Sequence, residues 1–168
     1  VLGIDPAINI AKKANNEGIK TIPKFFNLKT STLIKKKYFI PDILICRNVI
    51  PHVENINEII KSISELVHSN GKVYIEFHYA RNMSKYLHYD YIYHEHIFYF
   101  TIHTMINLLK KHGLYSNDYF LSPISGGSIV LVASKNNKKK SKILKKIIKH
   151  ENKTKMNSLR YWKNFQFA

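Results

Sequence analysis

The sequence has a single cysteine, Cys46, which excludes an internal disulfide framework and fits a reducing, cytoplasmic compartment. It has no apolar run near the roughly 18 residues that a membrane span needs. Arginine is scarce, with only Arg47, Arg81 and Arg160 among 27 basic residues. Proteins that recognise bases and phosphates favour the bidentate fork of arginine. The net charge of +16 therefore indicates a lysine-rich solvated surface rather than a nucleic-acid interface.

An initiator methionine and a signal-peptide n-region are also absent. Val1–Pro6 begins as if within a strand, and the aromatic tail 159–168 resembles the start of a further unit. We therefore expect a fragment of a longer protein. With 168 residues and 45% hydrophobic composition, the chain is still long enough to bury one sizeable core.

Strand and helix signals alternate along the chain. Short apolar runs predict strands at 1–4, 19–26, 41–46, 72–77, 114–121 and 128–134. The strand at 1–4 should be buried, and the run 41–46 is typical of a parallel-sheet strand covered on both faces. Apolar residues at helical spacing predict helices at 8–17, 55–67, 102–111 and 141–150, with a helix or loop at 28–38. The alternation is typical of a parallel α/β sheet, and the last two strands, which have no helix between them, should be antiparallel.

One stretch, 89–100, combines two imidazoles, two carboxylates and six aromatic rings. Three interpretations are open for it. The first is a surface strand or loop with aromatic packing. The second is a metal site, because His94 and His96 would share a face of a strand. The third is a general base held by neighbouring carboxylate and phenol groups.

Polar residues also follow two of the expected strands. Asp5 ends the first strand, where an acidic side chain suits hydrogen bonds to ribose hydroxyls, although Asp-Pro also initiates turns. His52 follows the strand at 41–46. In open α/β sheets ligands bind beyond the carboxyl ends of the strands, so His52 is well placed for a site.

The order of elements is similar to that of class I S-adenosylmethionine-dependent methyltransferases, with a Rossmann-like sheet and a closing antiparallel hairpin. Within that class, several segments resemble the sugar C-methyltransferase family, whose members methylate a carbon of nucleotide-linked keto-deoxysugars. The resemblance covers about residues 1–165, and the Tyr-His-Glu-His motif is its most specific part. The segments are 1–7, 47–49, His52, 92–96 and 126–128.

This resemblance implies a chemistry and a set of site residues. A base removes a proton beside the sugar ketone, and the enolate attacks the methyl group of S-adenosylmethionine. By resemblance His96 is the base, Glu95 and Tyr93 orient it or the sugar, and His52 is a second imidazole near the substrate. The cofactor would contact Asp5, Phe26, Asn27, Arg47 and Asn48, and no metal is expected.

The sequence also departs from that family. It has no G-x-G loop, and the family's first strand would lie between the strands at 1–4 and 41–46. We expect a gap there of roughly 9 to 10 Å, about two strand spacings. Where the family has a basic residue after Gly-Gly-Ser, this chain has Ile129 and Val130, which puts sugar-phosphate contacts at the hairpin in doubt.

These departures shape the expected organisation. We expect a partial methyltransferase domain over 1–135, then a basic helix and the start of a truncated C-terminal domain over 136–168, with the fragment inactive by itself. Two alternatives stay open: a methyltransferase of this fold that acts on another small molecule, and a non-catalytic remnant.

Overall fold

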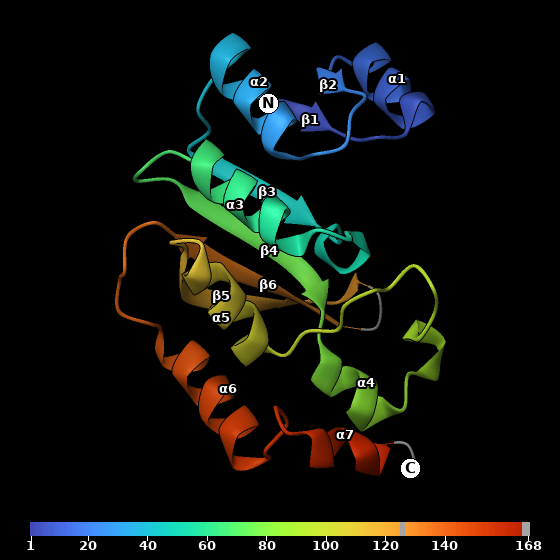
Figure 1. Cartoon of the computed structure of the whole chain (residues 1–168), viewed down its shortest axis with the longest axis vertical. Helices are drawn as coiled ribbons and strands as arrows, with labels where there is room; N and C mark the ends of the chain where they lie inside the picture. The colour runs from blue at the N-terminus through green and yellow to red at the C-terminus, as the bar shows by residue number, and fades with distance from the viewer. Residues whose placement is uncertain (125–126, 166–168) are drawn as a thin grey trace.

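The computed structural model of the chain describes residues 1–124 and 127–165 and contains two sheets (Figure 1). In the smaller sheet β1 (Gly3–Ile4) pairs with β2 (Thr21–Ile22) in parallel. The larger sheet has the order β3-β4-β6-β5. Its β3 and β4 are parallel, whereas β6 is antiparallel to both β4 and β5, which confirms the predicted closing pair. These strands are Ile43–Arg47 (β3), Lys72–His78 (β4), Tyr115–Ser122 (β5) and Ser128–Ser134 (β6).

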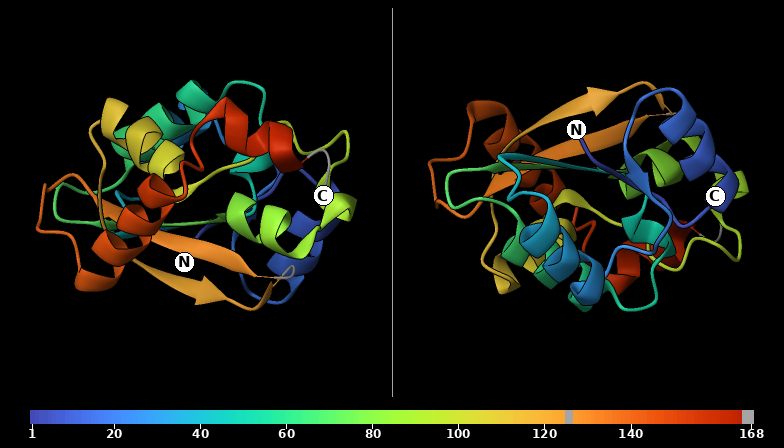
Figure 2. Two further views of the ribbon diagram at one scale, coloured as in Figure 1. Left: turned by 90° about the horizontal axis from the view of Figure 1, so that it is seen from below. Right: turned by 90° about the horizontal axis from the view of Figure 1, so that it is seen from above.

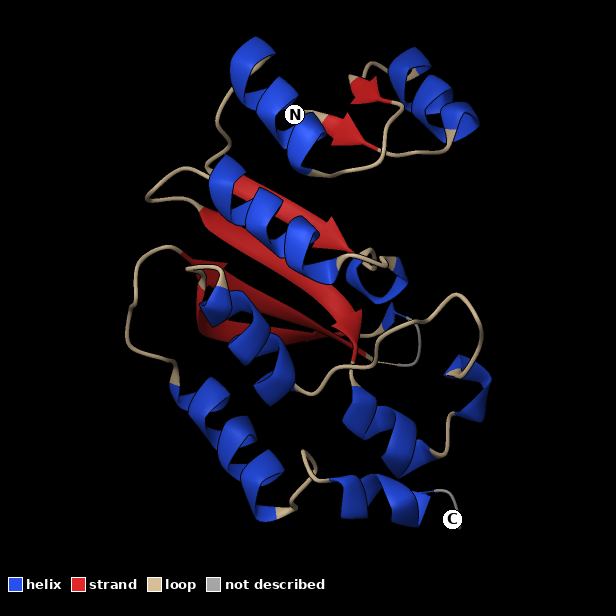
Figure 3. Cartoon of the chain, viewed as in Figure 1, coloured by secondary structure: helices blue, strands red, loops and turns tan. Residues whose placement is uncertain are grey.

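The helices largely follow the apolar periodicity (Figure 3). Asn55 caps α3 by accepting a hydrogen bond from the Glu58 amide, as predicted. The segment 28–38, left as helix or loop, is helical. Two short helices, α4 and α7, were not predicted, because the seven residues of each carry no clear apolar repeat. The α-helices are Ile8–Asn16 (α1), Leu28–Lys37 (α2), Ile56–Leu66 (α3), Ala80–Tyr86 (α4), Ile102–Lys111 (α5), Lys142–Lys153 (α6) and Leu159–Phe165 (α7), and the two 3-10 turns are Ile50–His52 (η1) and Tyr89–Tyr91 (η2).

The main core lies between the four-stranded sheet and the helices α3 and α5. Figure 2 shows these two helices on the same side of the sheet. Val73, Ile75 and Phe77 of β4 point to that side and are fully buried. Ile60 of α3 and Met105 of α5 pack in the same cluster. Among the described residues, none of the helices has the length and apolar character needed to span a bilayer.

A break separates β1 from β3, as the sequence predicted. The two strands belong to different sheets, and no strand lies between them in the described part of the chain. A second apolar cluster, built around Ile22, Ile34 and Leu66, joins the β1–β2 unit to the rest, with Phe26 and Leu44 touching both clusters. The small sheet is therefore held by side-chain packing rather than by strand pairing.

Two sequence-based expectations about strand burial were wrong. The run 41–46 predicted a strand covered on both faces, but the side chains of Ile43 and Ile45 are 59% and 64% exposed. The strand expected to be buried at 1–4 is half-buried over Gly3–Ile4, and Val1 is exposed. Helices cover only one face of β3, which leaves Ile43 and Ile45 exposed on the other. Among the described strands, none pairs with the far edge of β1.

Helix α6 packs against the start of α5 through one buried carboxylate. Glu151 is fully buried and accepts hydrogen bonds from the Tyr79 hydroxyl (2.8 Å) and from the amides of Ile102 (2.8 Å) and His103 (2.9 Å). It thus satisfies two of the free N–H groups at the start of α5, where a negative charge is also favoured. The separate C-terminal unit expected over 136–168 stays a prediction. Residues 166–168 of its tail lie outside the described residues.

Candidate active site

The stretch 89–100 forms a loop between α4 and α5, not a strand. Its C-terminal end meets the start of α4, where the Ala80 amide donates to the Phe100 carbonyl at 3.0 Å. At its middle, the Ile97 amide donates to the Pro51 carbonyl of η1 at 2.9 Å. These bonds fold the loop over the carboxyl ends of β3 and β4. His94 and His96 therefore do not share the face of a strand, as the metal interpretation required.

His96 is the one buried member of the motif 93–96, with 6% of its surface exposed. Its Nδ1 lies 2.9 Å from the Tyr91 carbonyl oxygen. A carbonyl only accepts, so Nδ1 carries the proton. In the neutral ring Nε2 then holds a lone pair, and the Tyr93 hydroxyl, 3.0 Å away, donates to it. The fold thus presents Nε2 of His96 as a base already bonded to a phenol.

His52 reaches the same place from η1. Its Nδ1 lies 2.9 Å from the Glu95 carbonyl oxygen, and its ring centroid is 4.8 Å from that of His96. The predicted neighbourhood of these two imidazoles is therefore present. For Glu95 the contact differs from the expectation, because its main-chain carbonyl holds His52 while its side chain is exposed. The predicted orienting role of the Glu95 carboxylate stays a prediction.

A third imidazole, His78, was not among the predicted site residues. It ends β4, and its ring centroid lies 5.1 Å from that of His96 and 4.9 Å from that of Tyr91. Both ring nitrogens are buried and have no hydrogen-bond partner among the described residues. Burial lowers the pKa of His78, and the neighbouring His96 and His52 lower it further. Its place at a strand end was the signal that could have identified it.

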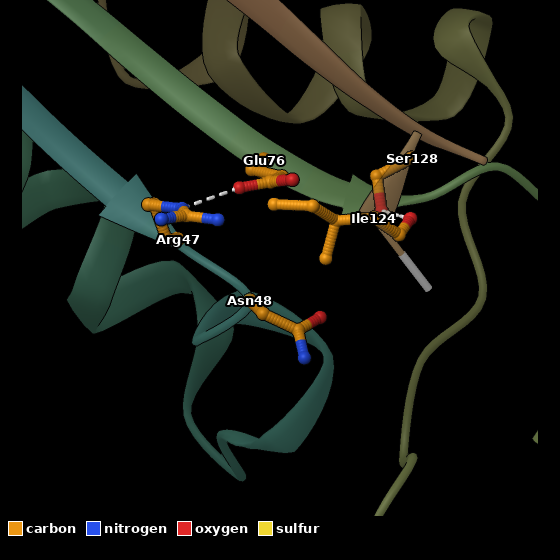
Figure 4. Close-up of a pocket in the computed structure, with 5 residues that line it drawn as sticks. All are labelled: Arg47, Asn48, Glu76, Ile124 and Ser128. Carbon is orange, nitrogen blue, oxygen red and sulfur yellow. Dashed lines mark hydrogen bonds and ion pairs between the residues drawn. The ribbon is translucent and has the colours of Figure 1, made fainter. Parts of the chain in front are cut away.

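A cavity of about 240 Å³ opens beside this cluster at the ends of β3, β4 and β6. Figure 4 shows Asn48 and Ile124 around it, with Glu76 facing Arg47. Asn48 has a left-handed backbone (φ 52°), which asparagine tolerates better than most residues. The predicted cofactor contacts Arg47 and Asn48 therefore lie together. The lining residues are Arg47, Asn48, Glu76, Ile124 and Ser128. Gly126, in the predicted Gly-Gly-Ser segment, lies outside the described residues.

The strongest ion pair at this cavity joins Arg47 and Glu76. Arg47 Nε donates to Glu76 Oε2 at 2.7 Å. Burial by itself would raise the pKa of Glu76, but the bond and charge of Arg47, with the nearby Ser122 hydroxyl, outweigh it and lower that pKa. The second oxygen, Oε1, is buried and has no hydrogen-bond partner in the part of the chain that the structure describes. Glu76 is a further residue that the sequence analysis did not select.

The remaining predicted cofactor contacts have local structural roles. Asp5 Oδ1 accepts a hydrogen bond from the Ala7 amide at 2.8 Å, which forms the turn into α1. Asn27 is the N-cap of α2, where its side chain accepts from the Thr30 amide at 2.9 Å. Phe26 is partly buried against both apolar clusters. In Figure 1 β1 and β3 point the same way, so the chain leaves both strands on the same side of the molecule.

The metal interpretation of the histidine-rich stretch finds no support. Within residues 1–124 and 127–165, no three His, Cys, Asp or Glu side chains are arranged to hold a metal ion. Cys46 is buried, and burial raises the pKa of its thiol to about 12, so it is not a thiolate ligand or nucleophile at neutral pH. The site is therefore built from imidazole, phenol, carboxylate and guanidinium groups.

Two solved structures resemble the fold. The magnesium protoporphyrin IX methyltransferase of Synechocystis PCC 6803, solved with S-adenosylhomocysteine, has a TM-score of 0.58 and 12% identity, covering 79% of this chain and 63% of that one. The 1,6-didemethyltoxoflavin-N1-methyltransferase of Burkholderia thailandensis has a TM-score of 0.53 and 12% identity, covering 79% of this chain and 60% of that one. These likenesses confirm the predicted Rossmann-like class I fold.

Sequence similarity agrees with the fold. The C-methyltransferase NovU of Streptomyces niveus is 32% identical over 134 residues, which make up 80% of this chain and 32% of that protein. The chain thus spans about a third of the length of this curated relative. The sequence profile described as a methyltransferase domain matches residues 1–116, more than half of the chain. The chain therefore belongs to the methyltransferase domain family.

Proposed function

We propose that this chain contributes to an S-adenosylmethionine-dependent C-methyltransferase whose acceptor is a nucleotide-linked keto-deoxysugar. The observation that carries the proposal is the bonded pair of Tyr93 and His96, set beside His52 and His78. Methylation at carbon needs a base, because a C–H bond next to a ketone must first lose its proton. The printed activity of NovU, a C-methyltransferase, supports the same reaction class.

The two members of the pair have different access to a ligand. His96 is 6% exposed, whereas Tyr93 is 41% exposed. A substrate therefore meets the Tyr93 hydroxyl first. In the proposed step the phenol oxygen takes the proton from the sugar carbon while its own proton passes to Nε2 of His96. The electrons of the broken C–H bond remain on the substrate as an enolate, which is the carbon nucleophile.

The surrounding residues hold this arrangement. The Tyr91 carbonyl fixes the proton on Nδ1 of His96, so that Nε2 stays free to accept. The Glu95 carbonyl fixes His52 in the same way, and we assign His52 to the sugar. Burial, and then the neighbouring rings of His96 and His52, lower the pKa of His78 and favour its neutral form beside the pair.

The residues at the strand ends fit a cofactor. Arg47 and Asn48 border the cavity with a cationic and an amide group, and Asp5 offers a carboxylate at the end of β1. We assign Asp5 to the ribose hydroxyls, Arg47 and Asn48 to the polar end of the cofactor, and Phe26 with Asn27 to the side of the adenine. S-adenosylmethionine, when bound, supplies the electrophilic methyl group.

The test is a two-part assay on a nucleoside-diphosphate-linked keto-deoxyhexose. In D₂O without cofactor, the wild-type protein should exchange the proton beside the ketone, read by mass spectrometry. With S-adenosylmethionine it should form a new carbon–methyl bond. His96→Asn should lower both rates by about 10² to 10⁴.

His94→Asn is the matched control, because His94 neighbours the pair and is exposed. It should leave both rates within a few-fold of wild type. Equal losses from the two variants would place the base elsewhere, and exchange at the wild-type rate in His96→Asn would remove His96 from the mechanism.

A further inference from the structure

Among the described residues, only one of the two carboxylate oxygens of Glu76 has a hydrogen-bond partner. Glu76 is 5% exposed, and its Oε2 is bonded to Arg47. Its Oε1 is buried, and no group within residues 1–124 and 127–165 makes a hydrogen bond to it, although the residue lines the cavity of about 240 Å³. A buried acceptor left unpaired is costly, and more so when it is charged. Such a group at a cavity calls for a partner, and a bound ligand can supply one.

The surroundings of Glu76 restrict the chemistry of that ligand. Oε1 can only accept, so the ligand must offer a donor. An ammonium donor would meet the Arg47 guanidinium, which already neutralises the carboxylate at 2.7 Å. A negatively charged ligand group would be repelled by the carboxylate itself. A neutral hydroxyl avoids both repulsions and satisfies Oε1.

We propose that Glu76 is a specificity-determining residue whose Oε1 accepts a hydrogen bond from a hydroxyl group of the bound ligand. Arg47 positions the carboxylate by holding Oε2, and the Arg47 side chain, 60% exposed, stays accessible from the cavity. Within the proposed function, on which this inference rests, two ligands carry hydroxyls. These are the ring of the sugar acceptor and the ribose of the cofactor.

Binding measurements separate these two sources. Three probes are titrated calorimetrically into wild type and Glu76→Gln: S-adenosylhomocysteine, a nucleoside-diphosphate-linked keto-deoxyhexose, and analogues of that sugar lacking one ring hydroxyl. Glutamine keeps the size of the side chain but removes the charge that strengthens the bond. If the hydroxyl is the sugar's, Glu76→Gln should weaken sugar binding about tenfold and leave S-adenosylhomocysteine unchanged. If the hydroxyl belongs to the ribose, Glu76→Gln should weaken S-adenosylhomocysteine binding about tenfold and leave sugar binding unchanged.

The analogue that lacks the contacted hydroxyl should bind wild type and Glu76→Gln equally, within about twofold. This cycle distinguishes a direct contact from a disturbed cavity, which would weaken all probes alike. Tyr74→Phe is the matched control, since Tyr74 lies two residues away on the same face of β4, outside this cavity. It should change none of the affinities.

Three results would overturn the assignment: unchanged affinity of Glu76→Gln for every probe, equal losses for all probes including the analogues, or no binding of any probe to wild type. These results are separable from the proposed function. Sugar that binds in a Glu76-dependent way without proton exchange would refute the methyltransferase chemistry and keep the subsite. Proton exchange by the wild-type protein, with no effect of Glu76→Gln on affinity, would support the proposed chemistry and refute the subsite.

Discussion

The two faces of β4 differ although they belong to one strand. Val73, Ile75 and Phe77 point towards α3 and α5, where each is fully buried in apolar surroundings. Tyr74, Glu76 and His78 point to the other side, where the last two retain buried polar atoms without partners. The first face gains stability from burial, whereas the second carries the cost of unpaired polar atoms, which a bound ligand would offset. The contrast predicts different consequences of substitution on each face.

The largest effect is expected on the helix-covered face. Phe77→Ala should lower the free energy of unfolding by about 3 to 5 kcal/mol, because it removes a ring from the closed core. Denaturant unfolding followed by circular dichroism measures it. A loss below about 1 kcal/mol would mean that this face is not the stabilising one.

Glu151 provides a comparison with Glu76, because both of its carboxylate oxygens accept hydrogen bonds although it is fully buried. Glu151→Gln should lower the free energy of unfolding by about 2 kcal/mol, since the amide NH₂ would face an N–H group of α5 and leave it unpaired. The exposed Glu54→Gln is the control in the same unfolding assay and should be neutral. Equal effects of the two variants would refute the capping role.

His78 should behave in the opposite way. His78→Phe removes two buried nitrogens that lack partners and keeps an aromatic ring against Tyr91. We expect the free energy of unfolding to stay level or rise by about 1 kcal/mol, while proton exchange on the sugar falls. A clear loss of stability would show that the His78 ring is a structural group.

The same residue predicts a pH dependence. The pKa of His78 is lowered in the folded protein, so below about pH 6.5 the unfolded chain binds a proton more readily. Stability should therefore fall as the pH drops through that value, and His78→Phe should show a shallower fall. Some dependence should persist from His112, whose pKa is lowered mainly by burial. Identical slopes in wild type and variant would exclude His78.

The smallest effect is expected at Tyr74, which lies on the uncovered face and lines a second cavity of about 330 Å³. Tyr74→Thr keeps β-propensity and should change the free energy of unfolding by about 0.5 kcal/mol or less. A loss comparable to that of Phe77→Ala in the same assay would erase the difference between the faces.

The sequence predicted those elements whose signals are local. The helix at 102–111 and the strand at 128–134 match the observed bounds, because apolar periodicity and glycine stops act within one segment. The break between β1 and β3 was also predictable, from the resemblance to methyltransferases. The short helix α4 was not, since its start is set by the bond between Ala80 and Phe100, twenty positions apart.

The candidate site also has features that the sequence predicted and features that only the tertiary structure shows. From the sequence came the residue types and the position of His52 beyond a strand end. The neighbourhood of His52 and His96 came from the resemblance to the sugar C-methyltransferase family. Only the tertiary structure decided which atoms meet: a main-chain oxygen of Glu95 on His52, the ring of His78 beside His96, and the unpaired oxygen of Glu76. Hydrophobic patterning fixes which face of an element is buried. Contacts between polar atoms of distant segments depend on how the packed elements close on one another, and no local pattern encodes that geometry.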